Sequence, residues 1–152
     1  MVLVSACLWG EHTRYDGRSS LCGELKQALA ERTVLLVCPE VMGGLSVPRL
    51  PARFVDAHYG QEGSEILANC AKLQDCNGRN VTHAYVKGAQ AVLALALGQR
   101  VKRAYLKDRS PSCGYDPEGR NPRGGPGLGV LSALLLQHGV EVIEVRASSV
   151  DS

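Results

Sequence analysis

Three cysteines stand at the ends of short apolar runs, or just beyond them, at widely separated positions in the sequence. Cys7 follows the run 2–6, Cys38 follows the run 34–37, and Cys113 lies in the loop after the run 101–106. Ligands of an open parallel sheet bind beyond the carboxyl ends of its strands, so strands formed by these runs would bring the three thiols together. Thiolates bind zinc ions and iron–sulfur clusters, and the pattern therefore predicts a metal centre at one edge of a sheet.

The spacing of these cysteines favours an iron–sulfur cluster. Structural zinc sites usually add a fourth Cys or His and show paired spacings such as C-x-x-C, which this chain lacks. Clusters are commonly held by four thiolates, so three leave one iron open, as a catalytic metal site requires. Two other interpretations stay open: a zinc-binding structural module, and simple burial, because free cysteine is among the most buried residue types.

The two loops that carry Cys38 and Cys113 also hold groups suited to proton transfer. Glu40 follows Cys38 by two residues, and Ser110 and Ser112 flank the approach to Cys113. Glutamates in loops are more often solvated, and serines often only hold a turn. Beside a metal-bound substrate, however, Glu40 could act as a general acid or base. The glycine-rich segment 124–129 opens a predicted helix, where free amides could bind an anion, although it lacks a P-loop ending.

Strands and helices alternate along the chain. The pattern predicts strands at 2–6, 34–37, 101–106 and 140–145, and helices at 21–31, 61–73, 81–98 and 128–138. Such alternation predicts a three-layer, Rossmann-like α/β domain with a mostly parallel sheet of about four or five strands. No repeat or linker is visible, so residues 1–152 are expected to form one domain. Cys22, Cys70 and Cys76 fall in or beside the helices and are expected to be ordinary thiols.

Composition excludes several classes of protein. The net charge is +2 and the basic residues are scattered, which argues against stable binding to nucleic acid or to a membrane surface. No apolar run approaches the roughly 20 residues of a spanning helix, and the N-terminus lacks the basic region of a signal peptide. We therefore expect a cytoplasmic protein, in which six cysteines serve metal binding, catalysis or burial rather than disulfides.

Four motifs together resemble the YbbK-like family, which includes bacterial thiouracil desulfidases. The motifs are Val4-Ser-Ala-Cys-Leu-Trp-Gly10, Arg14-Tyr-Asp-Gly17, Val37-Cys-Pro-Glu-Val-Met-Gly-Gly44 and Arg109-Ser-Pro-Ser-Cys-Gly114. The likeness extends through Val81-Thr82, Gly88-Ala89 and the segment 127–136, so it covers nearly the whole chain. Their order along the chain makes the match specific.

The resemblance implies a [4Fe-4S] cluster held by Cys7, Cys38 and Cys113, with one open iron for the sulfur of a thiolated uracil or related base. Water then replaces sulfur without net redox change, and sulfide is released. The family's acid/base carboxylate matches Glu40, and its helper serine matches Ser110. In physical terms, the iron is a Lewis acid, the carboxylate moves protons, and the hydroxyl stabilises developing negative charge.

The chain departs from the family pattern at three places. Gly114-Tyr-Asp-Pro-Glu-Gly119 replaces Ile-Tyr-Asp-Gly and a following Phe, Leu131-Ser-Ala-Leu134 replaces Thr-Ala-Ala-Leu, and Leu50 stands where a second proline is usual. None of these changes touches a predicted ligand, so we expect the substrate pocket to differ rather than the cluster. The rival function is a non-catalytic iron–sulfur or zinc-binding protein. Three ligands count against electron transfer, because carriers usually saturate all four irons.

Overall fold

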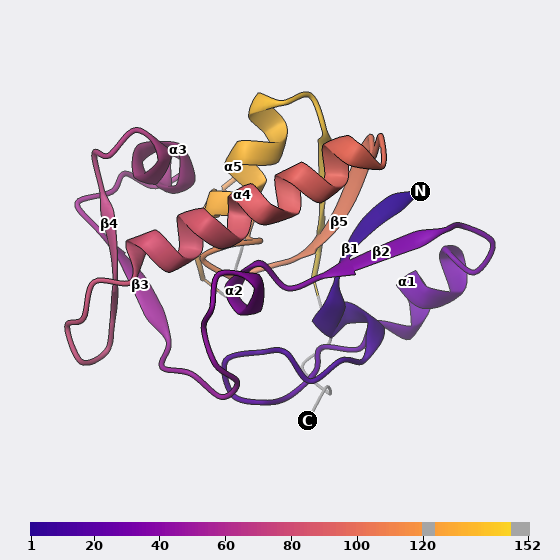
Figure 1. Cartoon of the computed structure of the whole chain (residues 1–152), viewed down its shortest axis with the longest axis horizontal. Helices are drawn as coiled ribbons and strands as arrows, with labels where there is room; N and C mark the ends of the chain where they lie inside the picture. Colours follow the sequence, from indigo (N-terminus) through magenta and orange to yellow (C-terminus); the bar gives the residue numbers. More distant parts are fainter. Residues whose placement is uncertain (120–123, 147–152) are drawn as a thin grey trace.

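A four-stranded parallel sheet forms the centre of the computed structural model, which describes residues 1–119 and 124–146 (Figure 1). Its strands are β1 (Val2–Ser5), β2 (Val34–Val37), β5 (Arg103–Lys107) and β6 (Glu141–Val145), in the order β2-β1-β5-β6. All four residues of β1 are buried, as expected for a central strand covered on both faces. The predicted α/β class with a mostly parallel sheet is confirmed.

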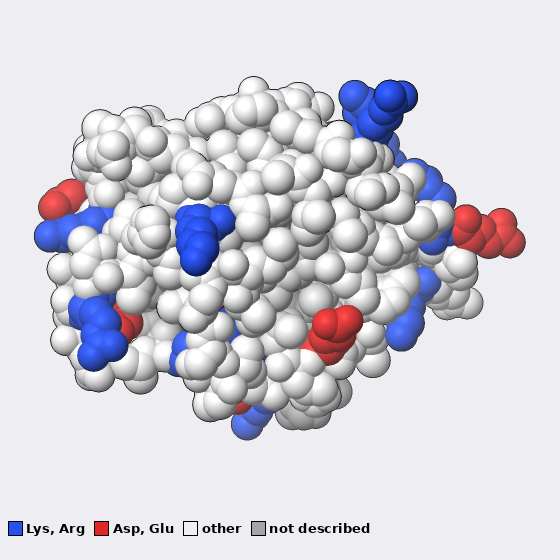
Figure 2. Space-filling view, in the orientation of Figure 1, with Lys and Arg blue, Asp and Glu red and all other residues white. Residues whose placement is uncertain are grey.

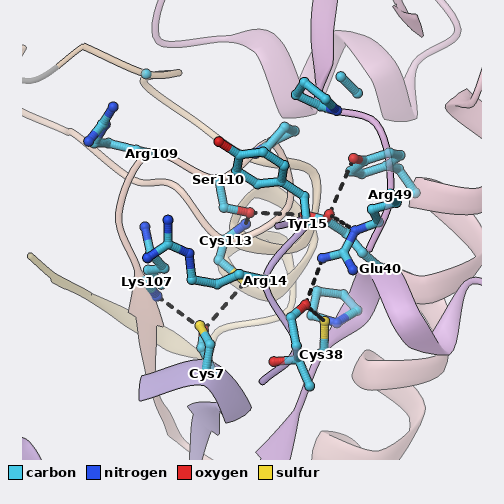
Figure 3. Close-up of a pocket in the computed structure, with 18 of the residues that line it drawn as sticks. Cys7, Arg14, Tyr15, Cys38, Glu40, Arg49, Lys107, Arg109, Ser110 and Cys113 are labelled. Atoms are coloured by element: carbon cyan, nitrogen blue, oxygen red, sulfur yellow. Dashed lines mark hydrogen bonds and ion pairs between the residues drawn. The ribbon is translucent and has the colours of Figure 1, made fainter. Parts of the chain in front are cut away.

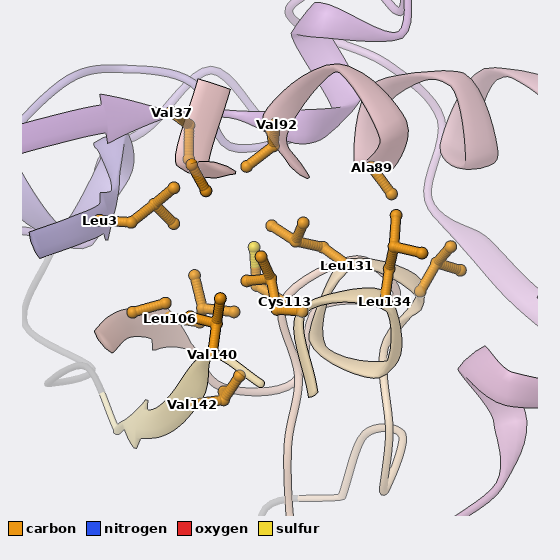
Figure 4. Close-up of a cluster of buried hydrophobic side chains, with 14 of the residues drawn as sticks. Leu3, Val37, Ala89, Val92, Leu106, Cys113, Leu131, Leu134, Val140 and Val142 are labelled. Atoms are coloured by element: carbon orange, nitrogen blue, oxygen red, sulfur yellow. The ribbon is translucent and has the colours of Figure 1, made fainter. Parts of the chain in front are cut away.

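Helices cover the two faces of the sheet unequally. The helices α4 (Thr82–Gly98) and α5 (Val130–Gln137) pack on one face, and α1 (Gly23–Ala28) lies against the other (Figure 1). Successive side chains of a strand point to opposite faces, so Leu3 joins the α4/α5 side while Val2 and Val4 join the α1 side. Figure 4 shows the larger core, where Leu3 and Leu106 of the sheet face Val92 and Leu131 of the helices.

The chain between β2 and α4 differs from the sequence prediction. The helix predicted at 61–73 ends early: α3 spans Glu62–Leu67, and Asn69 adopts a positive φ of 61°, which reverses the chain. Asparagine tolerates this left-handed conformation better than most residues. The following β4 (Lys72–Asp75) pairs antiparallel with β3 (Ala52–Val55), a second small sheet that was not predicted. Cys70 therefore follows a helix rather than lying in one.

Close packing of two helices fixes the first turn after β2. The short helix α2 (Pro39–Met42) lies against α4, where a Cβ on Gly88 would stand 1.8 Å from the Pro39 carbonyl oxygen. A Cβ on Gly43 would likewise stand 2.0 Å from the Ala84 carbonyl oxygen. Only glycine permits this backbone contact, so the residues on either side of Pro39 are held firmly to α4.

The surface shows no concentration of charge on the face seen in Figure 2, where basic and acidic side chains lie scattered among uncharged ones. Among the helices of the described ranges, none has the length and apolar character needed to cross a bilayer.

Candidate active site

A cavity of about 440 Å³ opens at the carboxyl ends of β1, β2 and β5. The five residues to which the family resemblance assigns roles line it: Cys7, Cys38, Glu40, Ser110 and Cys113 (Figure 3). The parallel strands deliver these residues from three distant parts of the chain to the same edge of the sheet. The site therefore combines thiols with a carboxylate and a hydroxyl.

Each cysteine is placed by a different local structure. Cys7 lies in the 3₁₀ turn η1 (Ala6–Trp9) that follows β1, and Cys38 immediately precedes α2. Cys113 lies in the turn after β5 and also packs in the main core (Figure 4). Cys113 therefore both packs in the core and lines the cavity.

Burial makes two of the thiols weaker acids than an exposed cysteine. Desolvation raises the pKa of Cys7 to about 11, and it raises the pKa of Cys113 as well. The positive charges of Lys107 and Arg14, which lie toward Cys7 in Figure 3, act in the opposite direction. The Lys107 ammonium is 3.6 Å from the fully buried carboxylate of Asp108, which helps to fix the cation beside the cavity.

The donor set of the cavity is rich in sulfur, the usual ligand atom of iron–sulfur clusters. Within residues 1–119 and 124–146, no group of three or more Cys, His, Asp or Glu side chains is close enough to hold a single ion. The three thiols nevertheless share one cavity, and cations beside Cys7 would offset the negative charge of thiolate ligands. Thiolates are the usual ligands of iron–sulfur clusters, so three thiols in one cavity fit such a group.

Glu40 is a buried carboxylate with three side-chain partners, unlike the solvated glutamates that are more common in loops. Its Oε1 accepts hydrogen bonds from Arg49 Nε at 2.8 Å and from the Tyr85 hydroxyl at 3.3 Å. Its Oε2 accepts a hydrogen bond from Ser110 Oγ at 3.2 Å. Burial raises the pKa of Tyr85, so this phenol stays protonated as a donor.

Arg49 is the principal site residue that the sequence analysis missed. Its guanidinium also donates to the carbonyl oxygens of Thr13 at 2.9 Å and Ser46 at 3.2 Å, which joins two loops to Glu40. The Thr13 carbonyl additionally accepts the Cys38 thiol at 3.7 Å. A lone arginine between Pro48 and Leu50 gave no hint of these partners, because they come from other segments.

Ser110 ties the carboxylate to the turn that holds Cys113. Its Oγ accepts the backbone N–H groups of Ser112 and Cys113, each at 3.1 Å, while its own proton goes to Glu40. A serine hydroxyl has one proton and two acceptor positions, so all are used. Ser112 is different, because its side chain is 1% exposed and does not line the cavity.

The amides at the start of α5 brace the site rather than bind an anion. The N–H groups of Val130 and Leu131 donate to the carbonyl oxygens of Pro111 and Ser112, both at 2.8 Å. Gly127 N–H donates to the buried carboxylate of Glu62 at 3.0 Å. The glycine-rich segment thus supports the turn that contains Cys113.

The segment after Cys113, where the chain departs from the family pattern, lies largely outside the cavity lining. Residues 115–119 do not line the cavity, and Asp116 instead accepts a hydrogen bond from the Tyr59 hydroxyl at 2.8 Å. Gly125 and Pro126, from the end of the same loop, do line it. Residues 120–123 lie outside the described part of the chain.

Comparisons with known proteins show what this chain is similar to. The model of the 2-thiouracil desulfurase family matches residues 2–146. The uncharacterized protein YbbK of Bacillus subtilis (strain 168) is 36% identical over 146 residues, which cover 94% of each protein. A solved structure of the [4Fe-4S]-dependent thiouracil desulfidase TudS is 36% identical, with a TM-score of 0.73, over 94% of this chain and 89% of that one.

Proposed function

Because this chain belongs to the 2-thiouracil desulfurase family and is a thiouracil desulfidase-like enzyme, we propose the following reaction for it. It replaces the sulfur of a thiolated uracil, or of a related thiolated base, by the oxygen of water and releases sulfide. The shared cavity of Cys7, Cys38, Cys113, Glu40 and Ser110 is the observation that carries the proposal. The three cysteines hold a [4Fe-4S] cluster and leave one iron without a protein ligand.

The residues around the cavity divide the remaining work. When bound, the cluster supplies a Lewis-acidic iron that polarises a thiocarbonyl group. Arg49 and Tyr85 hold Oε1 of Glu40, while Oε2 has a free lone pair beside its bond from Ser110. Glu40 takes a proton from the attacking water at Oε2 and passes it to the departing sulfur, so that the oxygen of water stays on the ring and its protons leave with the released sulfide.

The hydroxyl of Ser110 changes partner during this proton transfer. In the structure its proton is given to Glu40, and its two acceptor positions are filled by amides. Once Glu40 is protonated, that hydrogen bond is no longer needed to stabilise a negative charge. The hydroxyl then turns its proton toward the charge that develops on the substrate, as an oxyanion-stabilising donor does.

The rest of the wall suits a small planar ring. Tyr15 and Phe54 offer aromatic faces, and Pro51 and Pro126 add apolar edges. Such surfaces can stack against a free base and do not require that the base be part of a nucleic acid. We infer that the partner is a free small molecule, without stable nucleic-acid or membrane binding, and that the enzyme works in the reducing cytoplasm, where its thiols persist.

The experiment loads the protein with iron and sulfide without oxygen and measures sulfide released from 2-thiouracil and 4-thiouracil. The substitutions Cys7→Ser, Cys38→Ser and Cys113→Ser should each lose iron and activity. The matched controls Cys70→Ser and Cys76→Ser remove exposed thiols outside the cavity and should keep both. A fully loaded protein that releases no sulfide from either base overturns thiolated uracil as the substrate, while the assignment of the cluster stands.

A further inference from the structure

The Ser5 hydroxyl lies between two groups that come from the neighbouring strand and the loop after it. Ser5 ends β1, lines the cavity and is only 3% exposed. Its Oγ accepts the backbone N–H of Lys107 at 3.0 Å and donates to the sulfur of Cys113 at 3.4 Å. No role for this side chain follows from the proposed reaction.

The hydrogen bonds around Ser5 direct its hydroxyl proton toward the Cys113 sulfur. A serine hydroxyl has a single proton, and the Lys107 amide occupies one of its acceptor positions. That amide belongs to β5, which pairs with β1 in the central sheet, so the acceptor side of Ser5 is fixed by the backbone. Because Ser5 is buried, bulk water competes little for the proton. The bond to Cys113 is therefore built into the sheet.

The three thiols have unlike surroundings. Cys7 lies near the positive charges of Lys107 and Arg14 (Figure 3), and the Cys38 thiol donates to the Thr13 carbonyl oxygen. Cys113 instead receives a hydrogen bond from a neutral group. A hydrogen bond to a ligand sulfur draws electron density from it, and such bonds help to set the reduction potential of a cluster.

We propose that Ser5 is a positioning residue that raises the reduction potential of the bound cluster through its hydrogen bond to the Cys113 sulfur. The proposal rests on the three-cysteine cluster of the proposed function, but not on the substrate. An electron-poorer sulfur also makes the irons stronger Lewis acids, which favours polarisation of a thiocarbonyl.

The chain offers a matched control in Ser132. This serine is fully buried and donates to the same cysteine, but to the carbonyl oxygen of Cys113 at 2.9 Å rather than to the sulfur. Ser5→Ala and Ser132→Ala therefore remove equally small buried hydroxyls, and only the first removes a bond to a ligand atom. Ser5→Thr keeps the hydroxyl and tests rescue.

The experiment loads the unmodified protein and the three variants without oxygen, counts iron per chain, and measures the midpoint potential by spectroscopic redox titration. We expect Ser5→Ala to hold a full cluster at a lower potential, while Ser132→Ala and Ser5→Thr stay near the unmodified value. An unchanged potential in Ser5→Ala overturns the proposal, and so does an equal shift in Ser132→Ala. A Ser5→Ala chain that folds, as judged by circular dichroism, but binds no iron also overturns it, because the bond would then serve assembly.

These outcomes separate the inference from the proposed reaction. A loaded, unmodified protein that releases no sulfide contradicts the reaction, whereas a lowered potential in Ser5→Ala would still support the role of Ser5. An unmodified chain that takes up no cluster at all contradicts both.

Discussion

Arg49 Nε lies 2.8 Å from Glu40 Oε1, and their side chains are only 7% and 9% exposed. A buried ion pair of this kind is weak evidence for net stability, because desolvation of both charges offsets much of their attraction. Loss of one partner is a different matter, since the other charge then remains buried alone. The role of the pair is therefore tested by substitutions that remove one charge and leave the other buried without its partner.

Arg49→Met should destabilise the cluster-free protein by about 3–5 kcal/mol, because it leaves the Glu40 carboxylate buried without its cation. The double variant Glu40→Gln with Arg49→Met should recover part of this loss. Urea unfolding of the two single variants and the double variant gives the coupling between them. Strictly additive losses would show that the pair does not interact energetically.

Glu40→Gln should keep the cluster and lower the rate of sulfide release by about 10²–10⁴-fold, the usual cost of removing a general acid or base. The amide preserves the shape of the side chain but cannot take up a proton in the same way. The measurement is sulfide release at equal iron content, with Glu11→Gln on the exposed surface as the control. Normal turnover in Glu40→Gln would remove this carboxylate from the mechanism.

Ser110→Ala should lower the rate and also speed cluster loss, because the hydroxyl accepts the backbone amide of the proposed ligand Cys113 and also contacts Glu40. Ser112→Ala is the matched control two residues away. Its Oγ is buried and has no hydrogen-bond partner among the residues that the structure describes, so its removal should be neutral or slightly stabilising. Absorbance decay of the cluster under a chelator checks both variants, and equal decay rates would contradict the difference.

Alkylation of the cluster-free protein should distinguish the cavity thiols from the surface thiols. Since the thiolate is the nucleophile, a Cys7 pKa of about 11 leaves roughly one thiolate per thousand thiols at pH 8. Its rate with iodoacetamide should rise about tenfold per pH unit until the pH nears 11. Cys113, with a raised pKa and a buried side chain, should also react slowly, whereas exposed Cys70 and Cys76 should react first. Peptide mass spectrometry against time gives each rate, and early labelling of Cys7 would contradict this order.

The apolar runs were sufficient to predict the convergence of the cysteines. The segments 2–6 and 34–37 are short, β-branched and apolar, so their direction in a parallel sheet determines where Cys7 and Cys38 emerge. By contrast, Lys72–Asp75 is polar at three of its four positions, and its pairing with Ala52–Val55 depends on a contact between distant segments. The pattern of polar and apolar residues within one segment therefore could not predict that pairing.

The partners of Glu40 illustrate the same limit within the site. Arg49 comes from a loop, Tyr85 from α4 and Ser110 from the loop after β5, and no spacing in the sequence connects them. The resemblance to a family supplied Glu40 and Ser110 as candidates, but the ion pair with Arg49 emerged only from the fold. The partners of a buried charge are the residues that the fold places next to it. A local motif does not show which residues those are.

The contact between Gly88 and the Pro39 carbonyl has a consequence for how this enzyme can diversify. Cys38 and Glu40 flank Pro39, so one half of the cavity wall, with α2 clamped against α4, admits almost no change of position. The other half consists of loops that carry Tyr15, Arg109 and Pro126. Substitutions there can reshape the opening while the clamped half stays as it is. Substrate preference can thus drift under selection at Tyr15 and Pro126 while Cys38 and Glu40 keep their places, whereas the loop of Arg109 is less free to change because it also carries Ser110 and Cys113.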